Sequence, residues 1–439
     1  MTVANSLPDS GVKVGADASR SPQLPFWAGR SLALVGIILL ALNLRTAVTA
    51  ISPIVRFIDE DIPLDNIGLG VLGMLPPFAF AASAIFAPML SKRLGLESSV
   101  MWAIAVAVLG NLARSQSDSY VMLLTSSLLV FAGMGIGNVV LPPLVKRYFP
   151  DRIGLVTSLY ATVLAVGTTV PAFLAVPIAD EVGWRVSLGV WSALALLSLL
   201  PWIGVWLQRR GKEFTAAADD LAGMVEPPAF PARRIWHSRT AWALATVFAV
   251  TSFHVYAMFA WLPELLIDTA GKSPLGAGVL LAVYSAAGFP LAIVIPMLAA
   301  GMKNISWLIY AGALLWIIGY VGLIIAPTAA PWMWTLLIRG GSLTFPVCLV
   351  LISLRSRTHD GSVALSAFVQ AIGYTLAALG PLLVGLLHGL FHGWLGSYLL
   401  LLSTIVLSVA AGFVLRRPSF IEDELAHDDQ QTNSRHAIH

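Results

Sequence analysis

The sequence is short of charge. Only 11% of its 439 residues are Asp, Glu, Lys or Arg, whereas soluble domains carry about 25%. Hydrophobic residues make up 57%, and the mean hydropathy is +0.82. A surface so poor in charge does not suit water, so the composition excludes a set of soluble domains and predicts a membrane protein. The net charge of +3 gives no indication of nucleic-acid binding.

Cysteine and catalytic motifs are also scarce. The single cysteine, Cys348, excludes a disulfide framework and a thiolate metal site. The chain has no complete Gly-x4-Gly-Lys-Ser/Thr loop for an ATP-driven pump and no nucleophile–base pair for a membrane enzyme. His388 and His392 have the i, i+4 spacing of a zinc site, but no third ligand is evident, so an interfacial pair is the better interpretation. We therefore expect no catalytic residue, no metal and no cofactor.

Long apolar runs account for the hydrophobicity. A helix needs about 20 apolar residues to cross a bilayer. We predict twelve such spans, at 30–56, 66–91, 98–114, 119–144, 153–179, 186–207, 239–266, 274–301, 304–326, 331–353, 361–388 and 394–415. The predicted organisation is a disordered cytoplasmic tail at 1–29, a six-helix half at 30–207, a cytoplasmic linker at 208–238, a second six-helix half at 239–416 and a disordered cytoplasmic tail at 417–439. A sensor would need a larger signalling domain than this linker or tail.

Basic residues are distributed unevenly over the predicted connections. With both termini in the cytoplasm, 20 of the 26 Lys and Arg fall on the inner side and 4 on the outer side, while Arg45 and Arg339 lie inside predicted helices. Cytoplasmic loops of membrane proteins are enriched in Lys and Arg. The first apolar run exceeds 20 residues and has no clear cleavage site, so it is not a typical signal peptide. We predict a multi-pass protein of a bacterial-type inner (plasma) membrane with both termini cytoplasmic.

The two predicted halves repeat one another. Gly70-Val71-Leu72 recurs 208 residues later as Gly278-Val279-Leu280, and Gly183-Trp184 recurs 210 residues later as Gly393-Trp394. Two parallel six-helix repeats are the plan of major facilitator carriers, in which the substrate site lies between the halves near the membrane midplane. The predicted fold is an all-α membrane protein with twelve transmembrane helices in two pseudo-symmetric halves.

Several motifs, in order along the chain, resemble one family within that superfamily. Ala41-Leu42-Asn43-Leu44-Arg45, followed by Ser52-Pro53, resembles the first helix of the cyanate permease and 2-nitroimidazole transporter family. Further similar stretches are Gly137–Pro142, Gly183-Trp184-Arg185, Trp261-Leu262-Pro263 and Gly373-Tyr374. Thr46 departs from the family's Pro, and Arg339 stands where a small residue is expected. The resemblance implies a carrier of cyanate-like anions or nitroimidazole-like heterocycles.

Arg45 is the sharpest candidate for a substrate contact. It lies about 11 residues, or roughly 16 Å, from the outer end of the first predicted span. A charge at that depth is costly and usually faces a cavity or a partner. The nearest carboxylates, Glu264 and Asp268, lie only at the outer end of the seventh span. An unpaired guanidinium predicts a docking point for an anionic or strongly polar solute. The alternative is a structural Arg that is hydrogen-bonded to backbone carbonyls and Asn43.

Other polar side chains at mid-depth are further candidates. Thr49 extends the helix face of Arg45, His254 could bind substrate or carry a proton, and Arg339 could be a second anion contact or a gate residue. For each of these residues, hydrogen bonding between helices is the structural alternative. The predicted substrate-binding set is Arg45, Asn43, Thr49, Asn138, His254, Tyr256, Gln370, Tyr374 and Arg339.

These features predict a secondary active transporter of a small anionic or polar solute. We expect it to work by alternating access in the lipid bilayer, as a monomer. The alternative is a multidrug-type exporter of neutral small molecules, because the lack of an intramembrane carboxylate argues only against cationic drugs. Proton coupling is left open, through His254 or through a proton carried with a weak acid.

Overall fold

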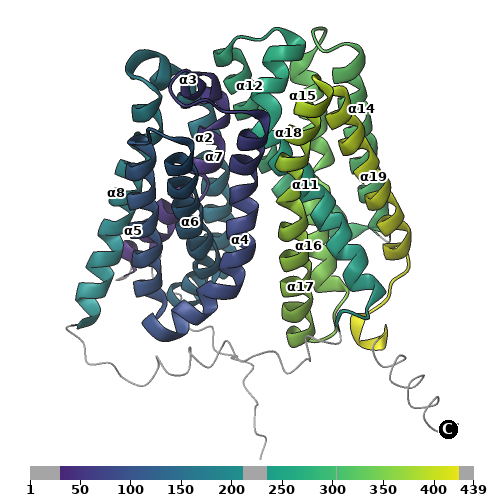
Figure 1. The fold of residues 1–439 in the computed structure, drawn as a ribbon. Coiled ribbons are helices and arrows are strands. Elements are labelled where there is room, and N and C mark those ends of the chain that lie inside the picture. Colours follow the sequence, from purple (N-terminus) through teal and green to yellow (C-terminus); the bar gives the residue numbers. More distant parts are fainter. Residues whose placement is uncertain (1–29, 211–234, 303, 425–439) are drawn as a thin grey trace, which may run out of the picture.

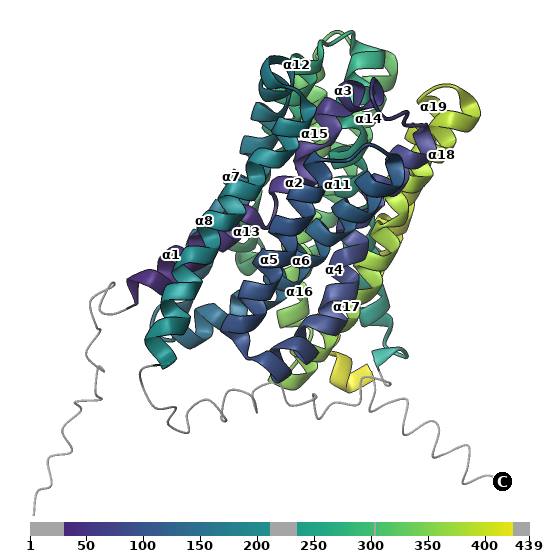
Figure 2. The same cartoon turned by 60° about the vertical axis from the view of Figure 1, so that its left-hand side comes forward.

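The computed structural model describes residues 30–210, 235–302 and 304–424 (Figures 1 and 2). Within these residues, twelve helical spans are long and apolar enough to cross a membrane, which confirms the predicted fold class. The first half contains α1 (Ser31–Asn43), α2 (Thr46–Ala50), η1 (Ser52–Ile54), α3 (Val55–Asp59), α4 (Asn66–Leu94), α5 (Leu96–Ser115), α6 (Tyr120–Tyr148), α7 (Ile153–Val182) and α8 (Trp184–Arg210). The second half contains α11 (Arg239–Ala270), α12 (Pro274–Ala286), α13 (Gly288–Gly301), α14 (Ser306–Ile325), α15 (Pro331–Gly341), α16 (Thr344–Leu354), α17 (His359–Ala377), α18 (Leu379–Phe391) and α19 (Leu395–Leu415).

The short connections begin several helices with capping side chains. Asp65 accepts a hydrogen bond from the backbone N–H of Gly68 at the start of α4, and Thr358 accepts one from Gly361 in α17. Ser119, Ser238 and Ser273 do the same for α6, α11 and α12. An oxygen at this position satisfies a backbone donor that has no partner within the helix. Short polar loops are therefore sufficient to fix where these spans begin.

The two halves lie side by side, the first at the left of Figure 1 and the second at the right. Helix α4 meets α18, and α7 meets α12, across the interface between the halves. Helix α11 is the most enclosed span, with 83% of its apolar window buried. We call the end of the bundle with the connections 60–65, 116–119 and 271–273 the outer end, because the sequence predicts it outside the membrane.

Four spans are interrupted inside the bundle. The first span breaks at Leu44 and Arg45, and the others break at Ala287, at Ser342 and Leu343, and at Ala378. Irregular backbone at membrane depth is tolerated where protein or a water-filled cavity surrounds it. At the first break, the Thr46 hydroxyl donates to the carbonyl of Asn43 at 3.0 Å, so one exposed backbone acceptor is satisfied locally.

The described structure differs from the predicted tail and linker at their edges. Helix α8 continues to Arg210, and residues 211–234 of the predicted linker lie outside the described residues, as do 1–29 and 425–439 of the two tails. The segment 418–424 packs against the second half instead of extending as a tail. Ile421 is buried, and its N–H donates to the Arg355 carbonyl at 3.0 Å.

Two acidic side chains explain this packing. Glu422 accepts hydrogen bonds from the N–H and hydroxyl of Thr358, at the start of α17. Glu424 accepts them from the Ser238 hydroxyl and the Thr240 N–H, at the start of α11. Carboxylates are stabilised at helix N-termini, where the backbone N–H groups have no partner within the helix. The composition of the segment gave no sign of these partners, because they lie more than 60 residues away in sequence.

Candidate functional site

The break in the first span places Arg45 between the two halves. Its Nη1 donates a hydrogen bond of 3.3 Å to the Tyr256 hydroxyl of α11, and its Cζ lies 5.0 Å from the centre of the Phe80 ring of α4. Tyr374 of α17 lies beside the same guanidinium. Arg45 is partly exposed, and none of the carboxylates in the described part of the chain forms an ion pair with it. Arg45 therefore lies between the two halves, and its role as a docking point for substrate stays a prediction.

The three rings around Arg45 contact one another edge to face. The centres of Phe80 and Tyr256 are 6.5 Å apart, those of Phe80 and Tyr374 are 6.3 Å apart, and those of Tyr256 and Tyr374 are 6.3 Å apart. We call Arg45 with these three rings the Arg45 group. A cation over an aromatic face is stabilised by the ring quadrupole without being neutralised. The partners of the guanidinium in this group are therefore aromatic rings and hydroxyls from both halves.

A small cavity continues from the Arg45 group towards the outer end. Its volume is about 30 Å³, and residues of both halves line it, among them Val48, Ser52, Gly73, Phe131, Tyr256 and Phe259. The Ser52 hydroxyl is buried and has no hydrogen-bond partner in the described residues. A site of this size holds about two water molecules. The cavity follows the part of the first span that leads from Arg45 to Arg56.

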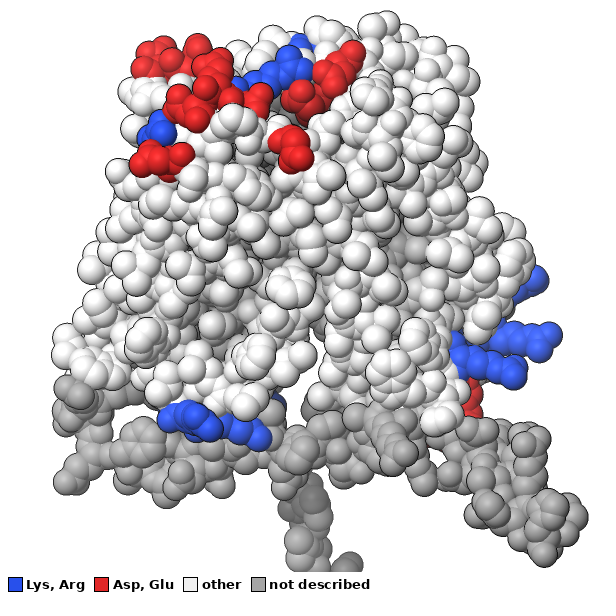
Figure 3. All heavy atoms as spheres, in the orientation of Figure 1, with Lys and Arg blue, Asp and Glu red and all other residues white. Residues whose placement is uncertain are grey.

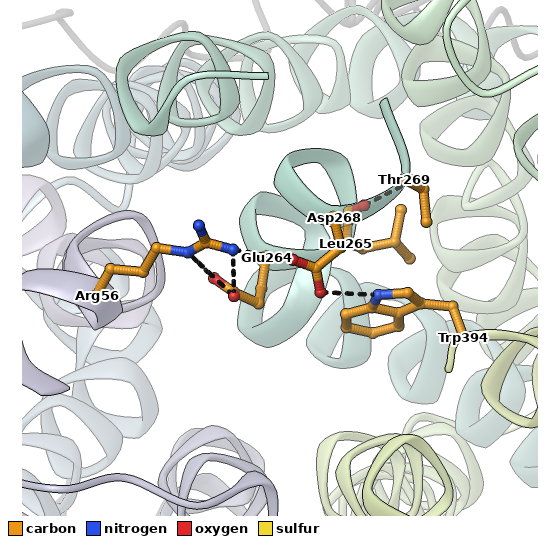
Figure 4. Close-up of polar contacts among 6 residues, drawn as sticks. All are labelled: Arg56, Glu264, Leu265, Asp268, Thr269 and Trp394. Atoms are coloured by element: carbon orange, nitrogen blue, oxygen red, sulfur yellow. Dashed lines mark hydrogen bonds and ion pairs between the residues drawn. The ribbon is translucent and has the colours of Figure 1, made fainter. Parts of the chain in front are cut away.

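An ion-pair cluster joins the two halves next to Val55, one of the residues that line this cavity. Arg56 of α3 contacts Glu264 through Nε at 3.1 Å and Nη2 at 2.8 Å, and its Nη2 also contacts Asp268 at 2.9 Å. The Trp394 indole donates to Asp268 at 3.1 Å. Figure 4 shows Arg56 reaching from the first half towards both carboxylates of α11, with Trp394 on the far side of Asp268. We call Arg56, Glu264 and Asp268 the outer ion-pair cluster.

A second charged group at the outer end belongs to the first half alone. The Asp61 carboxylate accepts a hydrogen bond of 2.9 Å from the Trp184 indole and pairs with Arg185. These hydrogen bonds, from Trp184 and then Arg185, hold the pKa of the Asp61 carboxyl below its usual value. Within the described residues, the hydrogen bonds that join the two halves all involve Arg45 or Arg56.

Three predicted site residues form hydrogen bonds with partners other than Arg45. Thr49 donates to the Thr168 carbonyl of α7 at 2.7 Å, and Asn43 accepts from Thr46. His254 is fully buried within the second half, with its ring nitrogens 2.8 Å from the Tyr320 hydroxyl and 2.9 Å from the Thr404 hydroxyl. These contacts are the structural alternatives considered for such residues. Their role in substrate binding stays a prediction.

The remaining predicted site residues are Gln370, Asn138 and Arg339, which lie on α17, α6 and α15. Gln370 lies one helical turn before Tyr374 and donates to the Ser366 hydroxyl at 2.8 Å. Asn138 is partly exposed in α6. Arg339 lies over the Tyr284 ring at 5.1 Å and packs so closely against Gly288 that an added Cβ there would collide with its Nη2. Arg339 therefore packs at the break between α12 and α13, and its contact with substrate also stays a prediction.

The comparison with known proteins agrees with this architecture. The sequence profile of the Major Facilitator Superfamily matches residues 33–376. The chain belongs to this superfamily. The transporter is 32% identical over 397 residues to the uncharacterized transporter YycB of Bacillus subtilis (strain 168). The aligned region covers 88% of this chain and 94% of the relative.

Two relatives bear the substrate names that the first helix led us to expect. The transporter is 29% identical over 389 residues to the 2-nitroimidazole transporter of Escherichia coli (strain K12), covering 87% of this chain and 96% of the relative. It is 27% identical over 369 residues to the cyanate transport protein CynX of the same organism, covering 82% and 91%. The predicted resemblance is confirmed, and these relatives are transporters, not enzymes.

Solved structures show the same fold at low identity. Two structures of a bacterial homologue of the human lysosomal transporter Spinster, both inward-facing, one occupied and one unoccupied, superpose with TM-scores of 0.71 and 0.73 at 17% and 16% identity. The alignments cover 90% and 91% of this chain and 98% and 99% of those chains.

Proposed function

We propose that this transporter is a secondary carrier of a small anion or strongly polar solute, with Arg45 as the group that docks the negative charge. The observation that carries the proposal is the Arg45 group itself, a guanidinium between the halves whose partners are aromatic rings and hydroxyls rather than a carboxylate. A cation at membrane depth without a counter-ion is costly. An anionic substrate supplies the missing counter-ion and gains charge-assisted hydrogen bonds.

The names of two relatives narrow the substrate class in this proposal. Cyanate is a small anion, and 2-nitroimidazole is a flat heterocycle with a polar nitro group. Phe80, Tyr256 and Tyr374 offer ring faces and edges to a flat solute, and Arg45 offers N–H donors to its oxygens. Both kinds of solute are therefore candidates for this chain.

Alternating access is the second part of the proposal. The halves meet at the outer end through the outer ion-pair cluster. At the opposite end, the space-filling view shows a crevice between them (Figure 3). The same view shows acidic residues gathered at the upper end and Lys and Arg at the lower end, which supports cytoplasmic termini. Rocking of one half against the other would close the crevice and separate Arg56 from Glu264 and Asp268.

Transport into proteoliposomes tests the role of Arg45. Wild type, Arg45→Lys and Arg45→Gln are compared with cyanate and with 2-nitroimidazole, and Arg185→Gln serves as the matched control for loss of an Arg outside the interface. A hydrogen-bonded charge contributes about 1.5–3 kcal/mol, so Arg45→Gln should lower kcat/KM for cyanate by roughly 10- to 150-fold. Arg45→Lys should retain part of the activity because it keeps the charge but loses the planar donor set.

Two outcomes would reject the anion assignment. Folded Arg45→Gln protein that moves cyanate as fast as wild type would make Arg45 structural. If only the neutral heterocycle moves, equally well with and without Arg45, the transporter is the neutral-solute exporter kept as the alternative. Size-exclusion profiles and melting temperatures of each variant separate these results from misfolding.

A further inference from the structure

The outer ion-pair cluster places acidic side chains at the seam between the halves. Glu264 and Asp268 are one turn apart on α11, and both contact the single guanidinium of Arg56. We propose that this cluster is an outer gate that responds to external acidity, so that protonation of the two carboxylates weakens their attraction to Arg56 and favours opening of the outer end. The proposal rests on the alternating-access part of the proposed function and does not depend on the identity of the substrate.

The cluster is exposed to the outside in the closed arrangement. The side chains of Arg56, Glu264 and Asp268 retain 46%, 22% and 34% of their exposure. Protons from the outer solution can therefore reach both carboxylates while the halves are in contact. Below the cluster, the cavity lined by Ser52 and Phe259 is small, and the Arg45 group follows it. The cluster therefore senses the outer solution rather than the inner one.

The groups that face the cluster come from both halves. Arg56 is the cation supplied by α3, and Trp394, in the turn before α19, donates to Asp268. Trp394 also stacks on His388 of α18, with ring centres 4.1 Å apart, and the buried Nδ1 of His388 has no hydrogen-bond partner among the described residues. His388 is therefore the titratable neighbour whose contribution the experiment must separate from that of the two carboxylates.

The charges make closure of the outer end depend on protonation. The two carboxylates and one guanidinium carry a net charge of −1 only while both acids are ionised. Each attraction to Arg56 requires its own acid to be ionised, so a proton on one acid removes one of the two attractions, and a second proton removes both. Proton binding and outer opening must then favour one another to the same extent, because linkage between two equilibria is reciprocal.

Labelling of Ser52 from the outside measures the opening. Ser52 lines the cavity beneath the cluster and is 7% exposed, so Ser52→Cys, in a Cys348→Ser background, should react slowly with an impermeant thiol reagent while the gate is closed. The rate is divided by that of Asp118→Cys, whose position is 87% exposed, to cancel the direct effect of pH on the thiol. The normalised rate should rise roughly three- to tenfold between about pH 7.5 and about pH 3.5, a range that extends below the pH at which free carboxyl groups gain their protons, as expected for two half-exposed ion pairs.

Variants of the cluster assign the response to named groups. Arg56→Gln, and Glu264→Gln combined with Asp268→Asn, should label fast at every external pH. Exchange of the charges, Arg56→Glu with Glu264→Arg, should restore slow labelling near neutral pH. His388→Gln should leave the pH response in place, because the carboxylates and Arg56 remain.

The control removes a comparable ion pair that does not join the halves. Arg185→Gln breaks the contact with Asp61, whose exposure is similar at 39% and 47%, and it should label like wild type. The proposal is overturned if folded Arg56→Gln protein keeps the slow, pH-dependent labelling of wild type, or if His388→Gln abolishes the pH response. A failure of the Arg45 transport test would leave these labelling results unaffected, so the two proposals fail separately.

Discussion

Replacement of Gly73 by alanine should shift this transporter towards an arrangement that is open to the outside. Gly73 lies on α4 where that helix meets α11 and α18 of the other half. A Cβ added there would lie 2.6 Å from the Cβ of Ala260 and 2.8 Å from the Cβ of Pro381. Neither neighbour has a flexible side chain that could turn away, so the helices themselves must separate.

The size of the shift follows from this geometry. Carbon atoms in contact prefer about 3.5–4.0 Å, so the two halves must part by about 1 Å at this point. Overpacking of a well-packed contact costs about 1–3 kcal/mol. The contact is lost when the outer end opens, so the cost falls on the closed arrangement alone. A bias of this size changes the ratio of open to closed molecules by roughly 5- to 150-fold.

External labelling of Ser52→Cys provides the assay, because Ser52 lines the cavity that the closed outer end covers. Gly204→Ala is the neutral control, since its Cβ would meet only Leu32 at the ordinary distance of 3.5 Å. Gly319→Ala is the packing control, since its Cβ would lie 2.6 Å from Ile338 in the same half. It should lower the melting temperature without faster labelling. Folded Gly73→Ala protein that labels at the wild-type rate would refute the reasoning.

Two further predictions concern stability rather than opening. His254→Phe removes a hydrogen-bond partner from the Tyr320 and Thr404 hydroxyls. The buried Tyr320 hydroxyl loses its His254 contact at a cost of about 1–3 kcal/mol, whereas Thr404 keeps its hydrogen bond to the Leu401 carbonyl. The melting temperature in detergent should therefore fall while the pH profile of transport is kept; a changed profile would instead support a proton-carrying role. Burial raises the pKa of Glu424, but hydrogen bonds from Ser238 and other donors lower it more, to a net value below the ordinary one. The stabilising contribution of Glu424 is therefore present above about pH 4.3, its unfolded pKa, and is lost as the pH falls through the lower folded value. Melting curves should show a smaller acid-induced loss of stability for Glu424→Gln than for wild type, and equal losses would contradict the assigned contacts.

The spans were predictable because the bilayer leaves the chain few choices. A segment in lipid must satisfy its backbone internally, so each apolar run of sufficient length becomes a helix. The interruptions were not predictable in the same way. No glycine or proline at Leu44 and Arg45 marks the end of a helix, and in the structure the Thr46 hydroxyl binds the Asn43 carbonyl at this break. Sequence periodicity carries no information about such contacts.

The candidate site likewise contains some residues that could be predicted from the sequence and others that could not. Arg45 could be found from depth and charge, and Tyr256 and Tyr374 from their places on spans seven and eleven. Phe80 could not be found, because a phenyl ring in an apolar run has no distinguishing signal. His254 was chosen for its depth, but depth does not tell which side of a helix faces the interface. On a helix as enclosed as α11, the His254 ring is instead held by two hydroxyls of its own half.

Gly73 and Arg56 act on one equilibrium through different physical terms. Steric contact at Gly73 involves Ala260 and Pro381, whereas the attraction at Arg56 involves carboxylates further along α11, and the two sets share no residue. If the halves move as rigid bodies, the two free-energy changes should add, as they do for sites without shared partners. The labelling rate of the double variant, relative to wild type, should then equal the product of the two single effects, up to the rate of the fully open state. A double variant no faster than Arg56→Gln alone, and still far below that limit, would mean that the outer end opens locally at α3 and that the halves do not rock as units.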